Sequence, residues 1–375
     1  MALPQQAGEP DAHHAVAPHQ HDTSLGHHDD SHTGGHGTSV PRRGQYRSHD
    51  LIFTTIARDA LVGARGSFPS EARAWATRHG PGVVLQRRLA QADRVSLAPL
   101  SPLHETPRRA GFAHLAFERA GPRTVVRTAL AHSPLRLLTP RNHGHAAWAY
   151  TSSFGGGLVD GDHLSLQVDV APGAAAWVSS QGANRVYRSP SGCRSDVSAR
   201  VGEDALLAWV PDPTACFTGA RYSQTLAFQL APGASLVLAD LITSGRSASG
   251  ERWAFSHYAS TLRVHVGERA LVDERWLLDP THGTLPERLG RFEAMATLLL
   301  VGPALATVRE ALHARITALP VTSRALLIPS SSPLGTQGLL VRAAAMSVEE
   351  LVRTTRDWLS FLPALLGDDP WARRV

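Results

Sequence analysis

Two aspartates lie in a short glycine-rich segment, residues 154–162, which reads FGGGLVDGD. Asp160 and Asp162 could form a carboxylate pair for acid–base chemistry or for binding a metal. Asp-Gly is also a strong hairpin-turn signal, and glycine permits positive φ and close backbone approach. The segment by itself favours a tight turn, with the functional carboxylate pair as the alternative. The glycines expected to form this turn are Gly155, Gly156, Gly157 and Gly161.

A second candidate segment, residues 211–217, reads PDPTACF. Its prolines favour an extended corner, and Asp212 and Cys216 lie close together in sequence, where they could contact a metal transiently. A single cysteine after a strand is more often a packed core residue, so that interpretation is preferred for Cys216.

A third segment, residues 244–253, reads SGRSASGERW and carries two opposite charges. Arg246 and Glu251 could pair across a turn as a solvated ion pair. If Glu251 is buried it needs a partner, and it then becomes a candidate functional residue. The sequence does not separate these two alternatives.

Histidine is concentrated in residues 1–49, which hold nine of the 20 histidines among Asp, Gly, Ser and Pro. Such a segment cannot form a core, so we predict a disordered extension. Imidazole binds nickel, copper and zinc, and paired or alternating histidines can chelate an ion without a fixed fold. We therefore expect weak, multi-site binding of divalent metal. The histidines that would provide it are His13, His14, His19, His21, His27, His28, His32 and His36.

Two further histidines, His143 and His145, form an H-x-H unit in the later part of the chain. On a strand, residues two apart point to the same face, which would suit a metal. No third ligand can be identified from the sequence, so a chance pairing is the preferred interpretation.

All 37 basic residues are arginine, because the chain contains no lysine. A Walker-type phosphate loop and a Schiff-base enzyme both need a lysine, so both classes are excluded. The arginines are scattered without interleaved aromatics, which does not favour nucleic acid. The net charge of +5 fits an acidic partner surface or simply a solvated basic surface. The two cysteines fit no zinc or disulfide pattern, and no secretory or membrane segment is seen, so we expect a cytoplasmic protein.

Short apolar and β-branched segments recur from about Gly111 onward, separated by Gly, Pro, Asp and Asn. This pattern predicts a mainly β body. Ala-Pro-Gly turns at 171–173 and 231–233 suggest an internal repeat of sheet layers. The predicted strands span 113–117, 123–129, 163–170, 174–179, 205–210, 224–230, 235–241, 261–266 and 271–278.

The C-terminal part has a helical pattern instead. We expect one amphipathic helix at 303–319 and another at 347–361, with Ser347 as N-cap and Glu350 at the capping-box position. A returning strand is predicted between them at 339–344. The chain thus divides into the histidine-rich extension at 1–49, an uncertain lead-in at 50–108 with a short helix at 70–79, and a β domain with C-terminal helices at 110–375.

Several segments occur in a fixed order: SPLRL at 133–137, GGGLVDGD at 155–162, QGANRVYRS at 181–189, and then PDPTACF, ARYSQ and SGRSASGERW. Together they resemble the UreD (UreH) family of urease accessory proteins, whose typical strings are a Pro-Leu strand, GGG-[IL]-V-x-GD and TKVY-[KR]-S. The resemblance covers residues 110–375. Arg185 stands where the family usually has lysine, and Asn184 replaces a common threonine.

The resemblance implies stacked β-sheets in a β-helix-like solenoid with two C-terminal helices, and a function without catalysis. Members of the family bind the urease apoprotein, a UreF-type helical accessory protein and a UreG-type GTPase, and they help to assemble the nickel centre. It also implies transient nickel rather than a permanent cofactor. A path must release its metal, so sparse carboxylates suit it better than a closed cage of histidine and cysteine. The residues carried over as nickel-passage candidates are Asp162, Asp212, Cys216 and Glu251, with Arg246 as an orienting cation.

Two other functions stay open at this point. One is a nickel or zinc buffer in which residues 1–49 are the main device. The other is a β-solenoid enzyme that uses Asp160 and Asp162. A scaffold should still activate urease without residues 1–49 when nickel is plentiful, whereas an enzyme should be active as the isolated chain.

Overall fold

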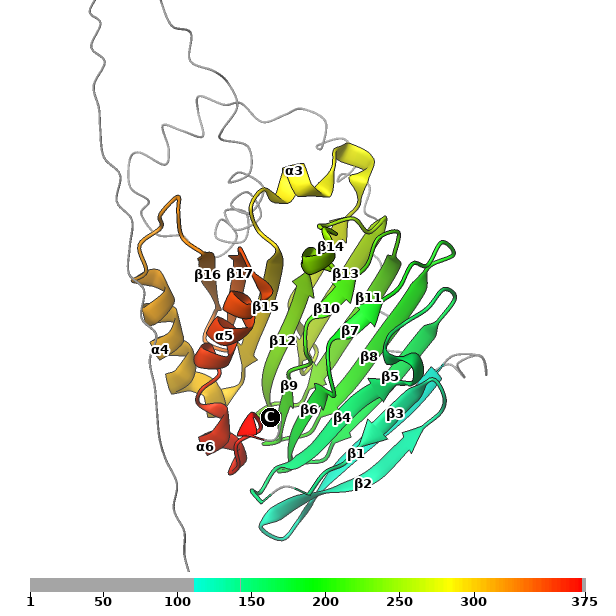
Figure 1. Cartoon of the computed structure of the whole chain (residues 1–375). Helices are drawn as coiled ribbons and strands as arrows, with labels where there is room; N and C mark the ends of the chain where they lie inside the picture. The colour runs from blue at the N-terminus through cyan, green and yellow to red at the C-terminus, as the bar shows by residue number, and fades with distance from the viewer. Residues whose placement is uncertain (1–110, 142, 373–375) are drawn as a thin grey trace, which may run out of the picture. The chain divides into compact units, whose positions relative to one another are not determined.

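The computed structural model describes residues 111–141 and 143–372, which form two β-sheets and a group of C-terminal helices (Figure 1). The prediction of a mainly β body with C-terminal helices is confirmed. The histidine-rich segment, the lead-in at 50–108 and the helix predicted at 70–79 lie outside the described residues.

Sheet A has the strand order β14-β13-β11-β8-β5-β1-β2. Its strands from β13 to β1 run parallel, and β14 and β2 pair antiparallel at the two edges. Burial alternates along these strands, as in a sheet that is covered on one face. Its strands are β1 (Gly111–Ala120), β2 (Arg123–Ala131), β5 (His163–Val170), β8 (Cys193–Val201), β11 (Arg221–Leu230), β13 (His257–Val266) and β14 (Arg269–Leu278).

Sheet B has the order β16-β17-β15-β12-β9-β6-β4-β3, with β10 paired to β12 and β7 paired to β10. Strands β6, β9 and β15 are buried at every position, because elements cover both faces of this sheet. Because both faces of these strands are covered, their sequences are almost continuously apolar. Its strands are β3 (Leu135–Leu138), β4 (Ala147–Ser153), β6 (Ala175–Ser180), β7 (Asn184–Val186), β9 (Leu206–Trp209), β10 (Thr214–Cys216), β12 (Ser235–Thr243), β15 (Ala294–Val301), β16 (Leu327–Leu334) and β17 (Gly338–Ala345).

The chain alternates between the two sheets from β5 to β13, and this path gives the body two different ends. Short turns at 171–173, 202–204 and 231–233 lead from sheet A to sheet B at the turn end. Each is closed by a backbone hydrogen bond of the same kind, for example from Ala205 N to Gly202 O at 3.1 Å. Longer loops return to sheet A at the loop end. These loops are residues 154–162, 181–192, 210–220 and 244–256.

The turn at 202–204 lies midway between the two Ala-Pro-Gly turns. The structural repeat is therefore half as long as the spacing of the Ala-Pro-Gly turns suggested. The middle turn reads Gly-Glu-Asp, so the sequence motif does not mark it. Asp204 there has a positive φ of 52°, and Gly173 and Gly233 also have positive φ, of 66° and 81°, at the same place in the other two turns. Aspartate tolerates this left-handed conformation better than most residues.

The predicted β-helix-like solenoid is not confirmed. Sheets A and B remain two separate sheets that are not closed into one coil. After β12, sheet B continues through the antiparallel strands β15, β17 and β16, and the alternation between sheets ends.

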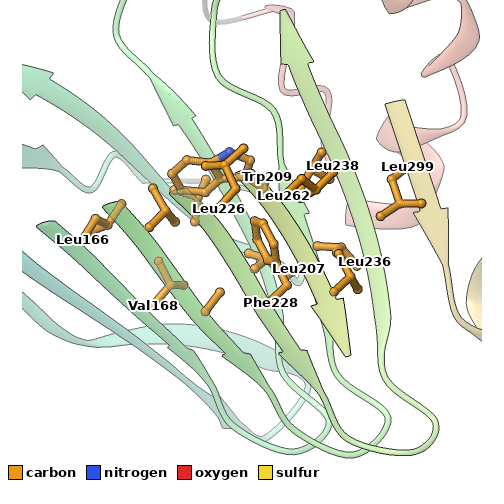
Figure 2. Close-up of a cluster of buried hydrophobic side chains, with 14 of the residues drawn as sticks. Leu166, Val168, Leu207, Trp209, Leu226, Phe228, Leu236, Leu238, Leu262 and Leu299 are labelled. Carbon is orange, nitrogen blue, oxygen red and sulfur yellow. The ribbon is translucent and has the colours of Figure 1, made fainter. Parts of the chain in front are cut away.

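The main core lies between the two sheets (Figure 2). Leu166 and Phe228 from sheet A meet Leu207 and Leu236 from sheet B, as residues two apart along each strand point to the same side. A second core on the other face of sheet B includes Trp148 and residues of the helices. This arrangement gives three layers: sheet A, sheet B and the helices.

Two of the helices, α4 (Ala306–Thr317) and α5 (Val348–Trp358), lie close to the predicted positions. The other α-helices among the described residues are α3 (Leu285–Leu289) and α6 (Leu362–Leu366), which were not predicted. Ser347 caps α5, since its Oγ accepts a hydrogen bond from Glu350 N at 3.1 Å. None of the helices in the described part of the chain has the length and apolar character needed to cross a bilayer.

Candidate functional site

A pocket of about 430 Å³ opens among the loop-end segments and extends between the two sheets. Gly156, Arg185 and Asp212 line its outer part, and Gln224 and Asp240 line it farther inside. A second cavity of about 20 Å³ also borders Asp240 and continues to Glu274. We call Asp212, Gln224, Asp240 and Glu274 the polar track, because they follow this succession of cavities through an otherwise apolar core.

Three members of the track occupy inward positions of predicted strands. Gln224 belongs to β11, Asp240 to β12 and Glu274 to β14. Each stands two residues from buried apolar or aromatic side chains, so strand geometry turns it toward the space between the sheets. The flanking residues on the same faces are Tyr222, Leu226, Leu238, Ile242, Val272 and Trp276.

Gln224 connects the two sheets. Its Nε2 donates to Asp240 Oδ2 on sheet B at 2.8 Å. The same amide nitrogen lies 2.9 Å from Ser260 Oγ and 3.1 Å from Tyr258 OH on the neighbouring strand β13. The Tyr222 hydroxyl donates to Gln224 Oε1 at 3.4 Å. The amide is therefore held by its neighbours while it supports the carboxylate.

A second connection lies deeper along the track. Asp240, Thr297 and Arg342 stand opposite one another on the adjacent strands β12, β15 and β17. Arg342 reaches across to sheet A, where its NH2 nitrogen lies 2.8 Å from Glu274 Oε1. Only 12% and 11% of the two side chains are exposed, so this is a nearly buried ion pair. Trp276 Nε1 also donates to Glu274 Oε1, at 2.5 Å.

The surroundings of Asp240 change its acidity. Burial raises its pKa to about 6, and the charge of Glu274 acts in the same direction, while the hydrogen bond from Gln224 partly offsets both. At neutral pH this carboxyl is therefore mostly ionised in a site that disfavours the charge. Burial also raises the pKa of Tyr222 and Tyr258, so both hydroxyls keep their protons.

Asp212, a residue singled out from the sequence, lines the outer part of the pocket. Its backbone N–H donates to Ser180 Oγ at 2.8 Å, and that hydroxyl lies 3.3 Å from Asp212 Oδ2. The strand end of β6 and the Pro-Asp-Pro corner after β9 thus hold the carboxylate beside the opening.

The Asp160 and Asp162 carboxylates are both bound to backbone within the loop end. Asp162 Oδ2 accepts from Val159 N at 2.8 Å, and Asp160 Oδ1 accepts from Ser191 N at 2.7 Å. Neither is among the described residues that line the pocket. This geometry is that of a turn, and it gives no support to a catalytic pair.

The glycines of this segment have backbone roles. A Cβ on Gly157 would lie 2.3 Å from Arg185 O, so no side chain fits where the loop meets β7. The other three have positive φ, with 83° at Gly155, 71° at Gly156 and 81° at Gly161.

Cys216 is fully buried in the inter-sheet core, and Cys193 is also buried. Burial raises the pKa of the Cys216 thiol well above its usual range, which keeps it protonated and a poor metal ligand. The structure thus places Cys216 as a packed core residue, while its role in nickel passage stays a prediction.

Arg246 and Glu251 form an ion pair across the loop between β12 and β13, with Arg246 Nε 3.1 Å from Glu251 Oε2. Glu251 Oε2 also accepts from Thr218 N at 3.3 Å. The hydrogen bond from Arg246 lowers the pKa of Glu251. The Arg246 guanidinium lies 4.5 Å from the centre of the Phe217 ring. Both residues lie at the loop end, outside the pocket.

The H-x-H unit does not lie on a strand, because β4 begins only at Ala147. His143 and His145 are both exposed, and His143 N donates to Asp368 Oδ2 at 2.9 Å. The premise for a shared face was therefore wrong. Within residues 111–141 and 143–372, no three His, Cys, Asp or Glu side chains gather as a metal-binding group.

Sequence reasoning missed three of the four residues of the polar track, and it also missed Arg342, which pairs with Glu274. Gln224, Asp240, Glu274 and Arg342 all fall at or inside predicted strands, and each occupies an inward position of its strand. A polar residue two positions from apolar ones on both sides was the available signal. What the sequence did not reveal is that these inward positions meet across two sheets.

The model of the family described as UreD urease accessory protein matches residues 109–375. This match covers well over half of the chain. The chain belongs to the UreD family.

Individual UreD relatives agree with this assignment. A urease accessory protein UreD of Sorangium cellulosum is 48% identical over 307 residues, covering 81% of this chain and 98% of that protein. A UreD of Anaeromyxobacter is 41% identical, covering 72% and 92%, and urease accessory protein D of Oryza sativa subsp. indica is 34% identical, covering 68% and 93%. The alignment covers 81% of this chain, a larger share than residues 109–375 make up, so the likeness to the Sorangium protein extends into the preceding segment.

Proposed function

We propose that this UreD-family chain is a non-enzymatic scaffold in urease maturation and that nickel crosses it along the polar track. The observation that carries the proposal is Asp240, an ionisable carboxyl with a raised pKa that borders both cavities between the sheets. Family membership supplies the urease context.

The chemistry of the track suits a cation in transit. An ionised Asp240 in surroundings that penalise its charge is stabilised when a cation approaches, which provides attraction without a closed cage. Glu274 Oε2 is buried and has no hydrogen-bond partner among the described residues, so it offers one more oxygen. Sparse oxygen ligands hold nickel less firmly than histidine or cysteine would, so the metal can leave again.

The ion pair of Arg342 with Glu274 acts as a barrier on this path. The cavity beside it holds only about 20 Å³, about the space of a single small solvent molecule, and the guanidinium neutralises the Glu274 carboxylate. Nickel can pass beyond Asp240 only if Arg342 moves away from Glu274. Passage through the chain therefore requires a rearrangement between sheets A and B.

The partners in this proposal are the urease apoprotein, a UreF-type helical accessory protein and a UreG-type GTPase, acting in the cytoplasm. The support for them is the family, whose curated members carry the name urease accessory protein in bacteria, plants and fungi. Nickel is cargo here and is bound only transiently.

Two double variants test the path. Asp212→Asn with Asp240→Asn removes two carboxylates of the track, whereas Asp162→Asn with Glu251→Gln removes two carboxylates of the loops. We expect the first to lower urease activation at limiting nickel by about tenfold or more, as two charged ligands are lost, and the second to retain most of it. The measurement is urease activity and urease-bound nickel in cells that co-express all the urease genes.

The amount of accessory complex purified with each variant serves as the control for folding and assembly. Full activation by the Asp212/Asp240 variant at limiting nickel would refute the track. Loss of activation only in the Asp162/Glu251 variant would instead place the path on the loop carboxylates that the sequence indicated.

A further inference from the structure

Arginine side chains stack on aromatic rings at two places of the loop end. The Arg136 guanidinium lies 4.9 Å from the centre of the Phe154 ring, and Arg246 stacks on Phe217 in the same way. Tyr187 meets Phe217 edge to face, with 5.4 Å between ring centres. We define the loop-end surface as Arg136, Phe154, Arg185, Tyr187, Phe217 and Arg246.

Part of this surface borders the pocket. Arg185 lines the pocket, and its guanidinium lies next to Gly156. Arg136 belongs to β3, where it pairs with Ser152, which also lines the pocket. A partner that covers the loop-end surface would therefore cover the entrance of the polar track.

At the loop end, three carboxylates have partners within the chain, whereas two arginines form no ion pair in the described residues. Asp160 and Asp162 accept hydrogen bonds from backbone N–H groups, and Glu251 pairs with Arg246. Arg136 and Arg185, in contrast, are exposed and form no ion pair with any carboxylate in the described residues. The carboxylates are thus tied into the fold, while positive charge is left available at the surface.

Apolar area accompanies this positive charge. Phe154 is 56% exposed and Val159 is 52% exposed, on the same loop. Exposed aromatic side chains next to arginine are typical of the residues that contribute most to protein–protein binding. A guanidinium stacked on a ring is held in place and keeps its N–H edge available for a carboxylate.

We propose that the loop-end surface is the docking site for an acidic surface of a protein partner. The inference rests on the proposed function and adds to it where the partner binds and what chemistry it presents. Carboxylates of the partner would pair with Arg136 and Arg185, while Phe154 and Val159 pack against its apolar centre. The arginines at the opening repel a free divalent cation, and an acidic partner removes that repulsion by neutralising them. Nickel then enters the track from the docked complex rather than from bulk solvent.

The test is charge reversal with a matched control. Arg136→Glu with Arg185→Glu changes the loop-end surface. Arg200→Glu with Arg269→Glu makes the same change in net charge with two exposed arginines near the turn end, which also form no ion pair in the described part of the chain. The affinity-tagged full chain is co-expressed with the urease apoprotein and its accessory proteins, and each co-purified component is quantified at low and at high salt.

We expect the loop-end reversal to reduce recovery of at least one of these components by about tenfold or more, and the turn-end reversal to leave recovery unchanged. Recovery by the unaltered chain should fall with salt, and this dependence should weaken in the variant. Arg136→Gln with Arg185→Gln, a milder change, should give an intermediate loss if reversal impairs folding.

Three outcomes would overturn the docking site. If both loop-end variants recover as much of every component as the unaltered chain does, the docking site is refuted, while the scaffold function stands. An equal loss in the turn-end control attributes the effect to net charge alone. If the unaltered chain recovers no urease component, the proposed function fails as well, and the two failures are thereby distinguished.

Discussion

At the residue scale, Asp240 is an ionisable carboxyl in the largely apolar core between the sheets. It is a carboxyl on an inward strand position, supported by the Gln224 amide and influenced by the charge of Glu274. Part of its surface remains accessible through the pocket, so the cost of its charge is smaller than for a fully enclosed carboxylate. A group of this kind attracts a cation and still lets it leave.

The raised pKa of Asp240 predicts a dependence of stability on pH. The folded state keeps the proton up to about pH 6, whereas the unfolded chain loses it near 3.8. Stability from this group is therefore fully present below pH 3.8 and is lost as the pH rises through 6. Asp240→Asn keeps the shape without the charge, and above pH 6 it should be more stable by roughly 2–3 kcal/mol.

The measurement is the free energy of unfolding in urea from pH 4 to pH 7.5. The difference between Asp240→Asn and the unaltered chain should shrink as the pH falls toward 4. Asp273→Asn, at a carboxylate whose side chain is 51% exposed, is the matched control. A difference that is constant across this pH range would contradict the raised pKa.

At the element scale, the two sheets are joined by polar contacts as well as by the apolar core. Gln224 connects β11 to β12, and Arg342 connects β17 to β14. Such contacts cost desolvation, so the sheets would pack at least as firmly with apolar residues in these places. Their presence in the core is consistent with the proposed nickel path, which apolar residues in these places would not provide.

Removal of Arg342 should reveal the free-energy cost of leaving the Glu274 carboxylate buried without an ion-pair partner. Arg342→Ala leaves Glu274 nearly buried without its partner, which should lower the free energy of unfolding by about 3–5 kcal/mol. Arg353→Ala removes an arginine that pairs with Glu350 on the surface of α5 and is 72% exposed, so it should cost less than about 1 kcal/mol. Urea unfolding at neutral pH compares the two, and equal effects would show that Arg342 and Glu274 are not a buried pair.

At the scale of the whole molecule, the body has a turn end with short connections and a loop end with long ones. The loop-end segments are the ones that carry the family's sequence strings, from GGGLVDGD to SGRSASGERW. Short turns leave little room for function, whereas loops on a rigid scaffold commonly carry it. The entrance of the polar track and the loop-end surface both lie there.

Residues 1–49 carry the remaining prediction, which rests on sequence alone. The chain without these residues should activate urease as well as the full chain when nickel is plentiful, and less well when nickel is limiting, because the histidines would raise the local supply. Urease activity across a series of nickel concentrations measures this. Failure of the shortened chain at every concentration would favour a buffer as the main function.

The sequence by itself determined the family, the mainly β body, most of its strands, and the N-cap of α5. These depend on local patterns, such as the alternation that gives β5 as His163–Val170 and the hydroxyl of Ser347 before a helical run. The sequence also identified Asp212 as a candidate site residue, because the prolines on both sides of it indicate an extended corner.

Only the tertiary structure revealed the polar track. Asp240, Glu274 and Arg342 are distant in sequence and become neighbours because the inner faces of sheets A and B meet. The same packing buries Cys216, whereas a local hydrogen bond from Val159 N holds Asp162 in its turn. A local pattern shows which face of a strand a residue takes, but only the packing of the sheets shows what it faces.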